Sequence, residues 1–259
     1  MNPAVAATPP SYGAPSWALT GLEPARAVLE YVGMRMMDPS ALPRGDGHAV
    51  VLFPGLASDR HAIGPLKGFC DELGYTGLDW GRGFNTGPQG DPDQWLDALS
   101  HHVQALTSTH EQAISLVGWS LGGIYAREVA KRLGPRVRQV ITIGTPFAGT
   151  SRHTRAGLVY RLLNGRNAEI GPALSRRLSM PPRVPTTSIY SRTDGVVAWQ
   201  ACVQRGHRAT TENIEVEGSH CGLGWNAGVF GVLADRLSQP HGAWRRYAQP
   251  RCGARRRAA

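Results

Sequence analysis

Short apolar runs alternate with helical patterns along most of the chain, and this alternation limits the fold more than any other feature. Runs rich in β-branched residues that end in glycine, proline or serine are typical of strands in a parallel sheet, whose faces are covered by helices. The sequence therefore predicts an α/β fold with a mostly parallel sheet of about six strands flanked by helices. The six runs are Ala49–Phe53, Tyr75–Trp80, Ile114–Val117, Val137–Ile143, Thr186–Tyr190 and Asn213–Val216.

Apolar residues recur at helical spacing between these runs. One stripe covers 66–73 and ends at Gly74, a second covers 95–106, and a third covers 229–237 with Asn226 as its expected N-cap. A further helix is expected over Glu23–Met37, with Pro24 in its first turn. These stripes are interpreted as faces that pack on the sheet.

The spacing of the runs also suggests how the chain is divided. Residues 45–240 hold the strands and are expected to form the main domain, preceded by an extension over 1–44 that carries one helix. The stretch 151–183 is longer than a single crossover helix needs, so we expect it to form a helical cap over the carboxyl edge of the sheet. Residues 241–259 are expected to be a basic, disordered tail.

The net charge of +9 is unevenly distributed. Residues 243–259 contain six arginines and no acidic residue, so the rest of the chain carries only +3. A basic tail of this kind is usually solvated, and no specific nucleic-acid partner is predicted. The expected cap holds seven arginines and one acidic residue, Glu169. Its outer face is either simply solvated, or it meets an anionic membrane surface while apolar residues beneath bind acyl chains.

The motif Gly118-Trp119-Ser120-Leu121-Gly122 follows a predicted strand and precedes a predicted helix. In that context GxSxG is a nucleophile elbow, a tight turn that strains the serine backbone and needs small residues two positions before and after it. The Ser120 hydroxyl would then stand at a helix N-terminus, where developing negative charge is favoured. Ser120 is therefore the predicted nucleophile.

A serine hydroxyl needs a base, and the base needs an acid that fixes its tautomer. His220 follows the last predicted strand in a loop bracketed by glycines, and Asp194 follows the strand before it. If all strands are parallel, both residues lie at the same sheet edge as Ser120. The predicted triad is Ser120, Asp194 and His220, in the order serine, acid, histidine.

An acyl-transfer intermediate also needs backbone N–H donors for its oxyanion. One expected donor is the N–H of Leu121, directly after the nucleophile. The other is the N–H of Leu56, in the loop Pro54–Ser58 that follows the first strand.

These motifs together resemble those of bacterial lipases and esterases of the α/β-hydrolase superfamily. The resemblance covers about residues 45–240 and includes, besides the triad motifs, Phe53–Leu56 and the segment Ile143–Thr150. It implies an α/β-hydrolase fold and ester hydrolysis through an acyl-enzyme. Such lipases often carry histidine where this chain has Phe147. The expected substrate pocket includes Trp119, Phe147, Phe84 and Leu223.

The expected substrate is a small-molecule or lipid carboxylic ester, but the sequence leaves other reactions open. The same acyl-enzyme could serve an acyltransferase, or hydrolysis of amides, thioesters or polyesters, and a binding protein without turnover could keep the fold. No metal or other cofactor is predicted, because neither GxGxxG nor HExxH occurs.

The sequence predicts a cytoplasmic protein, peripheral to a membrane if the cap meets one. The first residues lack a basic start followed by an apolar stretch, and no apolar run has spanning length. The cysteines are expected to be reduced, although a Cys202–Cys221 bridge stays open. The oligomeric state is not predicted.

Overall fold

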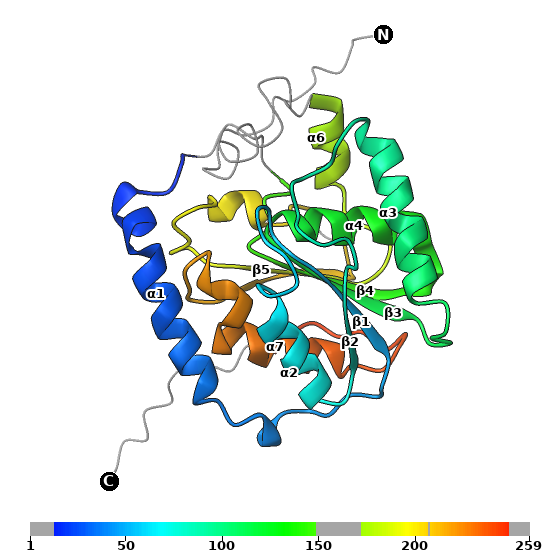
Figure 1. The fold of residues 1–259 in the computed structure, drawn as a ribbon, viewed down its shortest axis with the longest axis horizontal. Coiled ribbons are helices and arrows are strands. Elements are labelled where there is room, and N and C mark those ends of the chain that lie inside the picture. Colours follow the sequence, from blue (N-terminus) through cyan, green and yellow to red (C-terminus); the bar gives the residue numbers. More distant parts are fainter. Residues whose placement is uncertain (1–12, 149–171, 207, 249–259) are drawn as a thin grey trace.

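The structure is a computed structural model that describes residues 13–148, 172–206 and 208–248. These residues form a sheet of six strands in the order β2-β1-β3-β4-β5-β6 (Figure 1). All neighbouring strands are parallel, so their carboxyl ends meet at one edge of the sheet. The strands are β1 (Ala49–Phe53), β2 (Thr76–Asp79), β3 (Ile114–Trp119), β4 (Val137–Ile143), β5 (Thr186–Tyr190) and β6 (Thr211–Glu215).

The predicted α/β fold with six parallel strands is confirmed. β1, β4 and β5 have the predicted bounds, and the other strands differ from prediction by at most two residues at either end. Every residue of β1, β3 and β4 is buried, as expected for central strands covered on both faces. The burial of β6 is less continuous, because this strand lies at an edge of the sheet.

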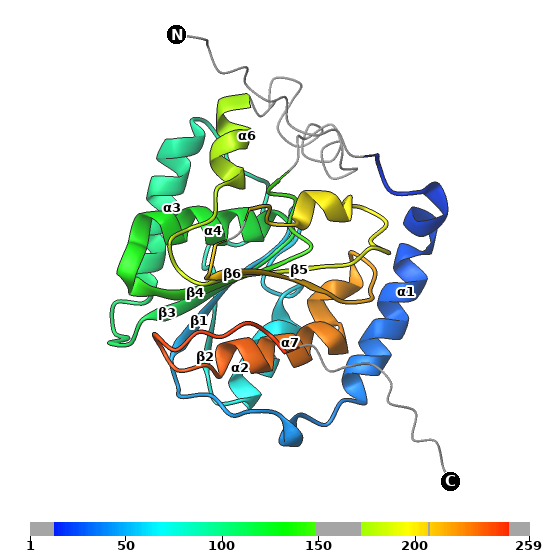
Figure 2. The same ribbon diagram turned by 180° about the vertical axis from the view of Figure 1, so that it is seen from behind.

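Helices cover both faces of the sheet (Figures 1 and 2). α3 and α4 pack on one face, and α2 and α7 pack on the other. The described helices are α1 (Trp17–Arg35), α2 (Gly64–Glu72), α3 (Pro92–Leu106), α4 (Leu121–Leu133), α6 (Pro172–Ser179) and α7 (Ala227–Leu237), with short 3-10 turns η1 (Pro39–Ala41), η2 (Gly134–Arg136), η4 (Trp199–Cys202) and η5 (Gly222–Trp225).

The predicted helical stripes form the core. Phe69 of α2 stacks on Phe230 of α7 with ring centroids 4.3 Å apart, below the sheet in Figure 1. Leu99 of α3 lies in the cluster on the opposite face. Asn226 caps α7 as predicted, because its Oδ1 accepts hydrogen bonds from the N–H groups of Gly228 and Val229.

The first helix differs from its prediction. α1 begins at Trp17, not at Glu23, because Ser16 is its N-cap and accepts a hydrogen bond from Leu19 N–H. Pro24 therefore lies inside the helix and not in its first turn. As a result Glu23 sits in the second turn, on the side of α1 that faces the domain, where it is buried.

Several expected regions lie wholly or partly outside the described residues. Of the expected cap over 151–183, the structure describes 172–183, which include α6. The first twelve residues of the extension and residues 249–259 of the expected tail are likewise not described. The cap and the disordered tail stay predictions.

No helix within the described part of the chain is long and apolar enough to cross a membrane. Cys70, Cys202 and Cys221 are free thiols, so the Cys202–Cys221 bridge that the sequence left open is not formed.

Candidate active site

Ser120 lies in the turn between β3 and α4, at the N-cap position of the helix. Its backbone has φ 53° and ψ −123°, a region that residues with a side chain rarely adopt. The turn is anchored by the Ser120 N–H, which donates to the Ile143 carbonyl at 2.8 Å. The serine is 7% exposed. Its hydroxyl stands at the end of a core strand and close to a helix N-terminus.

Three glycines make this turn sterically feasible. A Cβ on Gly118 would lie 2.3 Å from the Gly122 carbonyl oxygen, and a Cβ on Gly122 would lie 2.3 Å from the Phe53 carbonyl oxygen. A Cβ on Gly123 would lie 2.0 Å from Thr145 Oγ1. These approaches are too close for any side chain, in agreement with the small residues that the elbow motif requires.

His220 and Asp194 converge on Ser120 from two loops. His220 Nε2 lies 3.0 Å from Ser120 Oγ, and His220 Nδ1 lies 2.6 Å from Asp194 Oδ2. The loop of Asp194 follows β5 and the loop of His220 follows β6, so the parallel sheet brings all three residues to its carboxyl edge. We refer to Ser120, His220 and Asp194 as the carboxyl-edge triad.

The carboxylate of Asp194 is fixed by its own loop. Its Oδ1 accepts hydrogen bonds from the N–H groups of Val196 at 2.8 Å and Val197 at 2.7 Å. The remaining oxygen, Oδ2, faces His220. The side chain is buried, and hydrogen bonds therefore satisfy the charge that burial would otherwise penalise.

The surroundings of His220 favour its protonated form. Burial alone lowers the pKa of this imidazole, but the Asp194 carboxylate outweighs that effect through its charge and hydrogen bond, and the Glu23 carboxylate adds to it. The pKa of His220 is consequently raised above its ordinary value. A base of this kind accepts a proton readily and keeps it close to an ionised partner.

Trp119 and Glu23 hold the backbone of the His220 loop. The indole N–H of Trp119 donates to the His220 carbonyl at 3.2 Å. Glu23 Oε1 accepts from the His220 N–H at 2.9 Å, and Glu23 Oε2 accepts from the Cys221 N–H at 2.9 Å. Sequence reasoning missed Glu23, because α1 also carries Glu30 and no local pattern relates either acid to the His220 loop.

The two expected oxyanion donors lie beside the serine. Leu121 is the first residue of α4, and a Cβ on Gly55 would lie 3.4 Å from Ser120 Cβ, so the loop of Leu56 passes next to the nucleophile. Among the contacts between described residues, neither Leu56 N–H nor Leu121 N–H donates a hydrogen bond. Their role as oxyanion donors stays a prediction.

A buried asparagine shapes the loop of Leu56. Asn85 Nδ2 donates to the carbonyls of Pro54 at 2.9 Å and Gly55 at 3.0 Å. Its Oδ1 accepts from the Tyr125 hydroxyl at 3.2 Å and the Gly87 N–H at 3.0 Å. The glycine-rich loop that contains Asn85 thus positions the expected oxyanion loop.

The expected pocket residues occupy different environments. Trp119 and Leu223 are buried near His220, whereas Phe147 is buried beneath the guanidinium of Arg127, 3.8 Å from its ring centroid. Phe84 is 56% exposed. Their contact with a substrate stays a prediction.

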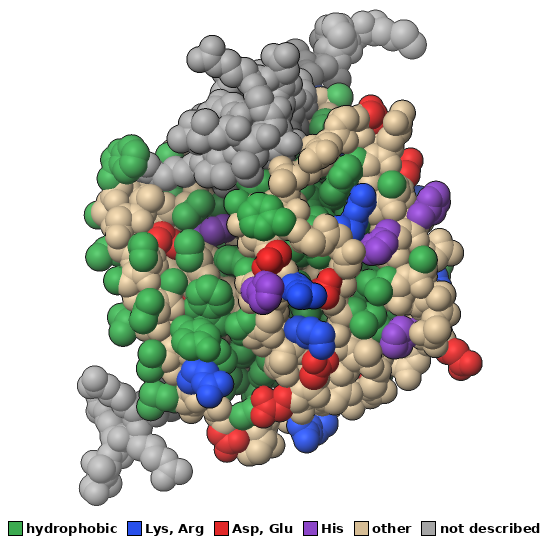
Figure 3. Space-filling model, viewed as in Figure 1, with side chains coloured by type: hydrophobic (Ala, Val, Ile, Leu, Met, Phe, Trp, Pro, Cys, Tyr) green, Lys and Arg blue, Asp and Glu red, His purple; other side chains and the backbone are tan. Residues whose placement is uncertain are grey.

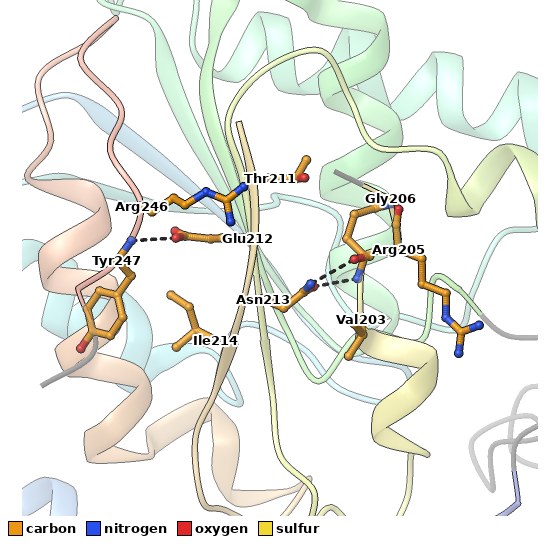
Figure 4. Close-up of a pocket in the computed structure, with 10 residues that line it drawn as sticks. Val203, Arg205, Gly206, Thr211, Glu212, Asn213, Ile214, Arg246 and Tyr247 are labelled. Atoms are coloured by element: carbon orange, nitrogen blue, oxygen red, sulfur yellow. Dashed lines mark hydrogen bonds between the residues drawn. The ribbon is translucent and has the colours of Figure 1, made fainter. Parts of the chain in front are cut away.

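A hollow away from the triad lies along the outer edge of β6 (Figure 4). Asn213 exchanges two hydrogen bonds with the backbone of Gln204, and Glu212 accepts from the Tyr247 N–H. The polar groups there are thus bonded to one another. No group of three or more His, Cys, Asp or Glu side chains within the described residues could hold a metal ion.

Comparisons with known proteins relate part of the chain to esterases and most of it to structures with the α/β-hydrolase fold. No family model matches the chain. A pimeloyl–acyl-carrier protein methyl ester esterase of Shewanella woodyi is 32% identical over 102 residues, which are 39% of this chain. The match spans 37% of that relative, well under two thirds of its length.

Solved structures resemble a larger share of the chain. Lipase B of Aspergillus fumigatus matches with a TM-score of 0.58 and 18% identity over 80% of this chain and 57% of its own. An alpha/beta superfamily hydrolase of Oenococcus oeni matches with a TM-score of 0.54 and 16% identity over 75% of this chain and 94% of its own. The chain has the α/β-hydrolase fold and resembles the esterases and lipases of that superfamily.

Proposed function

We propose that this protein is a serine esterase that cleaves carboxylic esters through an acyl-enzyme on Ser120. The observation that carries the proposal is the unbroken chain from Ser120 Oγ through His220 to Asp194, with distances of 3.0 Å and 2.6 Å, on a strained turn at a helix N-terminus. The similarity to esterases over part of the chain supports the same reaction class.

In the acylation step, His220 Nε2 takes the proton of the Ser120 hydroxyl while Oγ forms a bond to the ester carbonyl carbon. The carbonyl electron pair moves onto oxygen, and the N–H groups of Leu56 and Leu121 stabilise that oxyanion. Asp194 stays ionised and holds the Nδ1–H tautomer. When the tetrahedral intermediate collapses, the C–O bond to the alcohol breaks and the alcohol leaves with the proton from Nε2.

Deacylation repeats these steps with water. His220 Nε2 removes a proton from water as the water oxygen attacks the acyl carbon. The bond to Ser120 Oγ then breaks, and Oγ recovers its proton from Nε2. The products are a carboxylic acid and the free serine.

The test is hydrolysis of p-nitrophenyl esters with acyl chains from C2 to C16 by the parent and by Ser120→Ala, with Ser115→Ala as the control. We expect Ser120→Ala to lose at least about 10³-fold in kcat and to resist labelling by a fluorophosphonate. Ser115→Ala should retain both reactions. Equal labelling of the parent and Ser120→Ala would overturn the proposal.

A second part of the proposal is peripheral contact with an anionic membrane surface. It is supported by α1, whose exposed residues are all uncharged except Arg35. Figure 3 shows hydrophobic side chains gathered over this helix. The acids of α1 turn inward, and an outward face without carboxylates suits an anionic surface. Its large exposed side chains are Trp17, Leu22, Val28, Leu29, Tyr31 and Val32, followed by Met36 at the C-cap.

Flotation with phosphatidylglycerol vesicles tests this contact. We expect binding that weakens in Leu29→Ser, because the exposed face of α1 is apolar. Met180→Ser, which changes an exposed apolar residue outside α1, is the matched control and should float as the parent does. A parent that does not float would overturn the membrane contact. Dimers of the parent that Leu29→Ser abolishes would show that the exposed face of α1 binds a second copy of the chain instead.

A further inference from the structure

We propose that Glu23 of α1 is a positioning residue that holds the catalytic base His220 in line with Ser120. The proposal rests on the triad function stated above. Glu23 touches neither substrate nor Ser120 in this proposal, and it acts through the backbone of the two loops that carry Asp194 and His220.

The contacts of Glu23 are confined to those two loops. Its Oε1 accepts hydrogen bonds from the Gly195 N–H at 2.7 Å and the His220 N–H at 2.9 Å. Its Oε2 accepts from the Cys221 N–H at 2.9 Å. Glu23 Oε1 therefore links Gly195, the residue after Asp194, to His220. This link fixes the separation of the two loops.

The side chain is 4% exposed, so its carboxylate is a buried charge, and its hydrogen-bond donors among the described residues are backbone N–H groups. A buried carboxylate is costly unless hydrogen bonds compensate it. Three backbone N–H donors supply that compensation, and they do so only when both loops hold the geometry that the triad needs. The burial of Glu23 thus couples the position of α1 to the position of His220.

Neighbouring contacts keep α1 in register with the loops. Thr20 Oγ1 donates to the Gly195 carbonyl at 2.6 Å, and the guanidinium of Arg26 donates to the carbonyl and hydroxyl of Thr193 at 2.5 Å and 2.8 Å. A Cβ on Gly195 would lie 2.6 Å from the Leu19 carbonyl carbon. The helix backbone therefore lies directly against the acid loop, and Glu23 cannot swing away.

Glu23 also acts on His220 through its charge. The groups that face His220 are Asp194 from the loop after β5 and Glu23 from α1, and both carboxylates raise the pKa of the imidazole against the effect of burial. The neighbouring Cys221 thiol is protonated, because burial raises its pKa to about 12. Loss of the Glu23 charge should therefore lower the pKa of His220.

Glu23→Gln is the decisive variant, because it keeps the shape and removes the charge and one acceptor. Glu30→Gln is the matched control on the same helix. Glu30 accepts from the Ser219 N–H at 2.7 Å and from Asn226 Nδ2, and the N–H groups of His220 and Gly195 donate to Glu23 instead. Both variants are compared with the parent by circular dichroism and thermal unfolding, so that a folded state is established first.

Two readouts separate positioning from general support. NMR titration of the histidine ring, with His220 assigned from the spectrum of His220→Asn, should give a lower pKa for His220 in Glu23→Gln than in the parent or Glu30→Gln. The acid limb of kcat/KM should shift to lower pH in the same variant. We expect kcat to fall about 10-fold to 100-fold with KM nearly unchanged, because a small displacement of a catalytic group has an effect of this size.

The outcomes distinguish this proposal from the proposed function. A Glu23→Gln protein with the parental His220 pKa and pH profile overturns the positioning role, while a serine-dependent parent activity leaves the esterase standing. Equal shifts in Glu23→Gln and Glu30→Gln overturn it too, because they indicate loosening of the whole helix. If the parent hydrolyses no ester, the NMR titration still decides whether Glu23 sets the state of His220.

Discussion

The carboxyl edge and the amino edge of the sheet each carry a serine, a histidine and an aspartate joined by hydrogen bonds. At the amino edge, His48 Nε2 lies 2.8 Å from Ser115 Oγ and His48 Nδ1 lies 2.5 Å from Asp46 Oδ1. These distances are as short as those of the carboxyl-edge triad. We call Ser115, His48 and Asp46 the amino-edge triad, and its chemistry is limited by its surroundings.

The two serines differ in backbone and access. Ser115 lies within strand β3 and has no exposed surface, so no substrate can reach its hydroxyl. Ser120, only five residues further along, lies on the strained turn at the start of α4 and is 7% exposed. Hydrogen-bond geometry alone therefore does not make a nucleophile.

The two histidines differ in electrostatics. Burial lowers the pKa of His48, and the charge of Arg138 lowers it further against the effect of Asp46. Asp46 is itself paired with Arg138 at 2.6 Å, which neutralises much of its influence. Among the described residues no arginine acts on His220 in this way, and its pKa is raised. At His48 the effect of the aspartate is thus outweighed by burial and by the arginine charge, whereas at His220 the carboxylates outweigh burial.

Replacing each histidine in turn should give the largest difference in kcat between the two sites. His220→Asn should lower kcat for p-nitrophenyl butyrate by about 10³-fold or more, because the base is lost. His48→Asn should leave kcat of the folded protein within about twofold, because the two sites share no partner. It should instead cost about 1–3 kcal/mol in urea unfolding, since buried polar groups lose a partner. A comparable loss of kcat in folded His48→Asn would contradict this view.

The contributions of the two histidines to folding stability should depend on pH with opposite signs. His48, whose pKa in the folded state lies below its ordinary 6.5, contributes stability that is present above that pH and lost as pH falls below it. His220, whose pKa lies above 6.5, contributes stability that is present below that pH and lost as pH rises through the folded pKa.

Two measurements check these signs. The acid limb of kcat/KM should lie above pH 6.5, because His220 must be neutral to act as a base. The difference in unfolding free energy between the parent and His48→Asn should shrink as pH is lowered from about 8 to about 5. A shift of the acid limb of kcat/KM in His48→Asn would show that the carboxyl and amino edges of the sheet are coupled.

The smallest effect is expected from Asp46. Its side chain is 47% exposed, so its pairs with His48 and Arg138 are screened by solvent. Asp46→Asn should cost at most about 1 kcal/mol in urea unfolding, and the cost should decrease in high salt. Its kcat should equal that of the parent, whereas Asp194→Asn should lose activity severely. A large loss of stability in Asp46→Asn would indicate that the amino-edge triad is more tightly coupled than its exposure suggests.

The sequence predicted the sheet and the positions of the triad well, because both depend on local patterns. The elbow around Ser120 needs glycines at fixed spacing, and the order of strands in the chain carries Asp194 and His220 to the same edge. The helical stripes predicted the core because burial follows a regular period.

The role of Glu23 could not be predicted, because it depends on contacts between distant segments. Proline favours the first turn of a helix, so Pro24 suggested a helix that starts at Glu23. The helix instead starts at Ser16, which turns Glu23 toward loops that local patterns do not relate to it. The Asn85 network has the same origin, since an asparagine in a glycine-rich loop does not reveal which carbonyls it will bind.

The bridge made by Glu23 has a consequence for how the molecule assembles. Glu23 is separated along the chain by 172 residues from Gly195 and by 197 from His220. Contacts of such separation close late in folding, because much of the chain must first be ordered. We therefore expect the elbow to form with the sheet and the base to take its final place only when α1 docks, so that an intermediate with a complete sheet would still lack an aligned base.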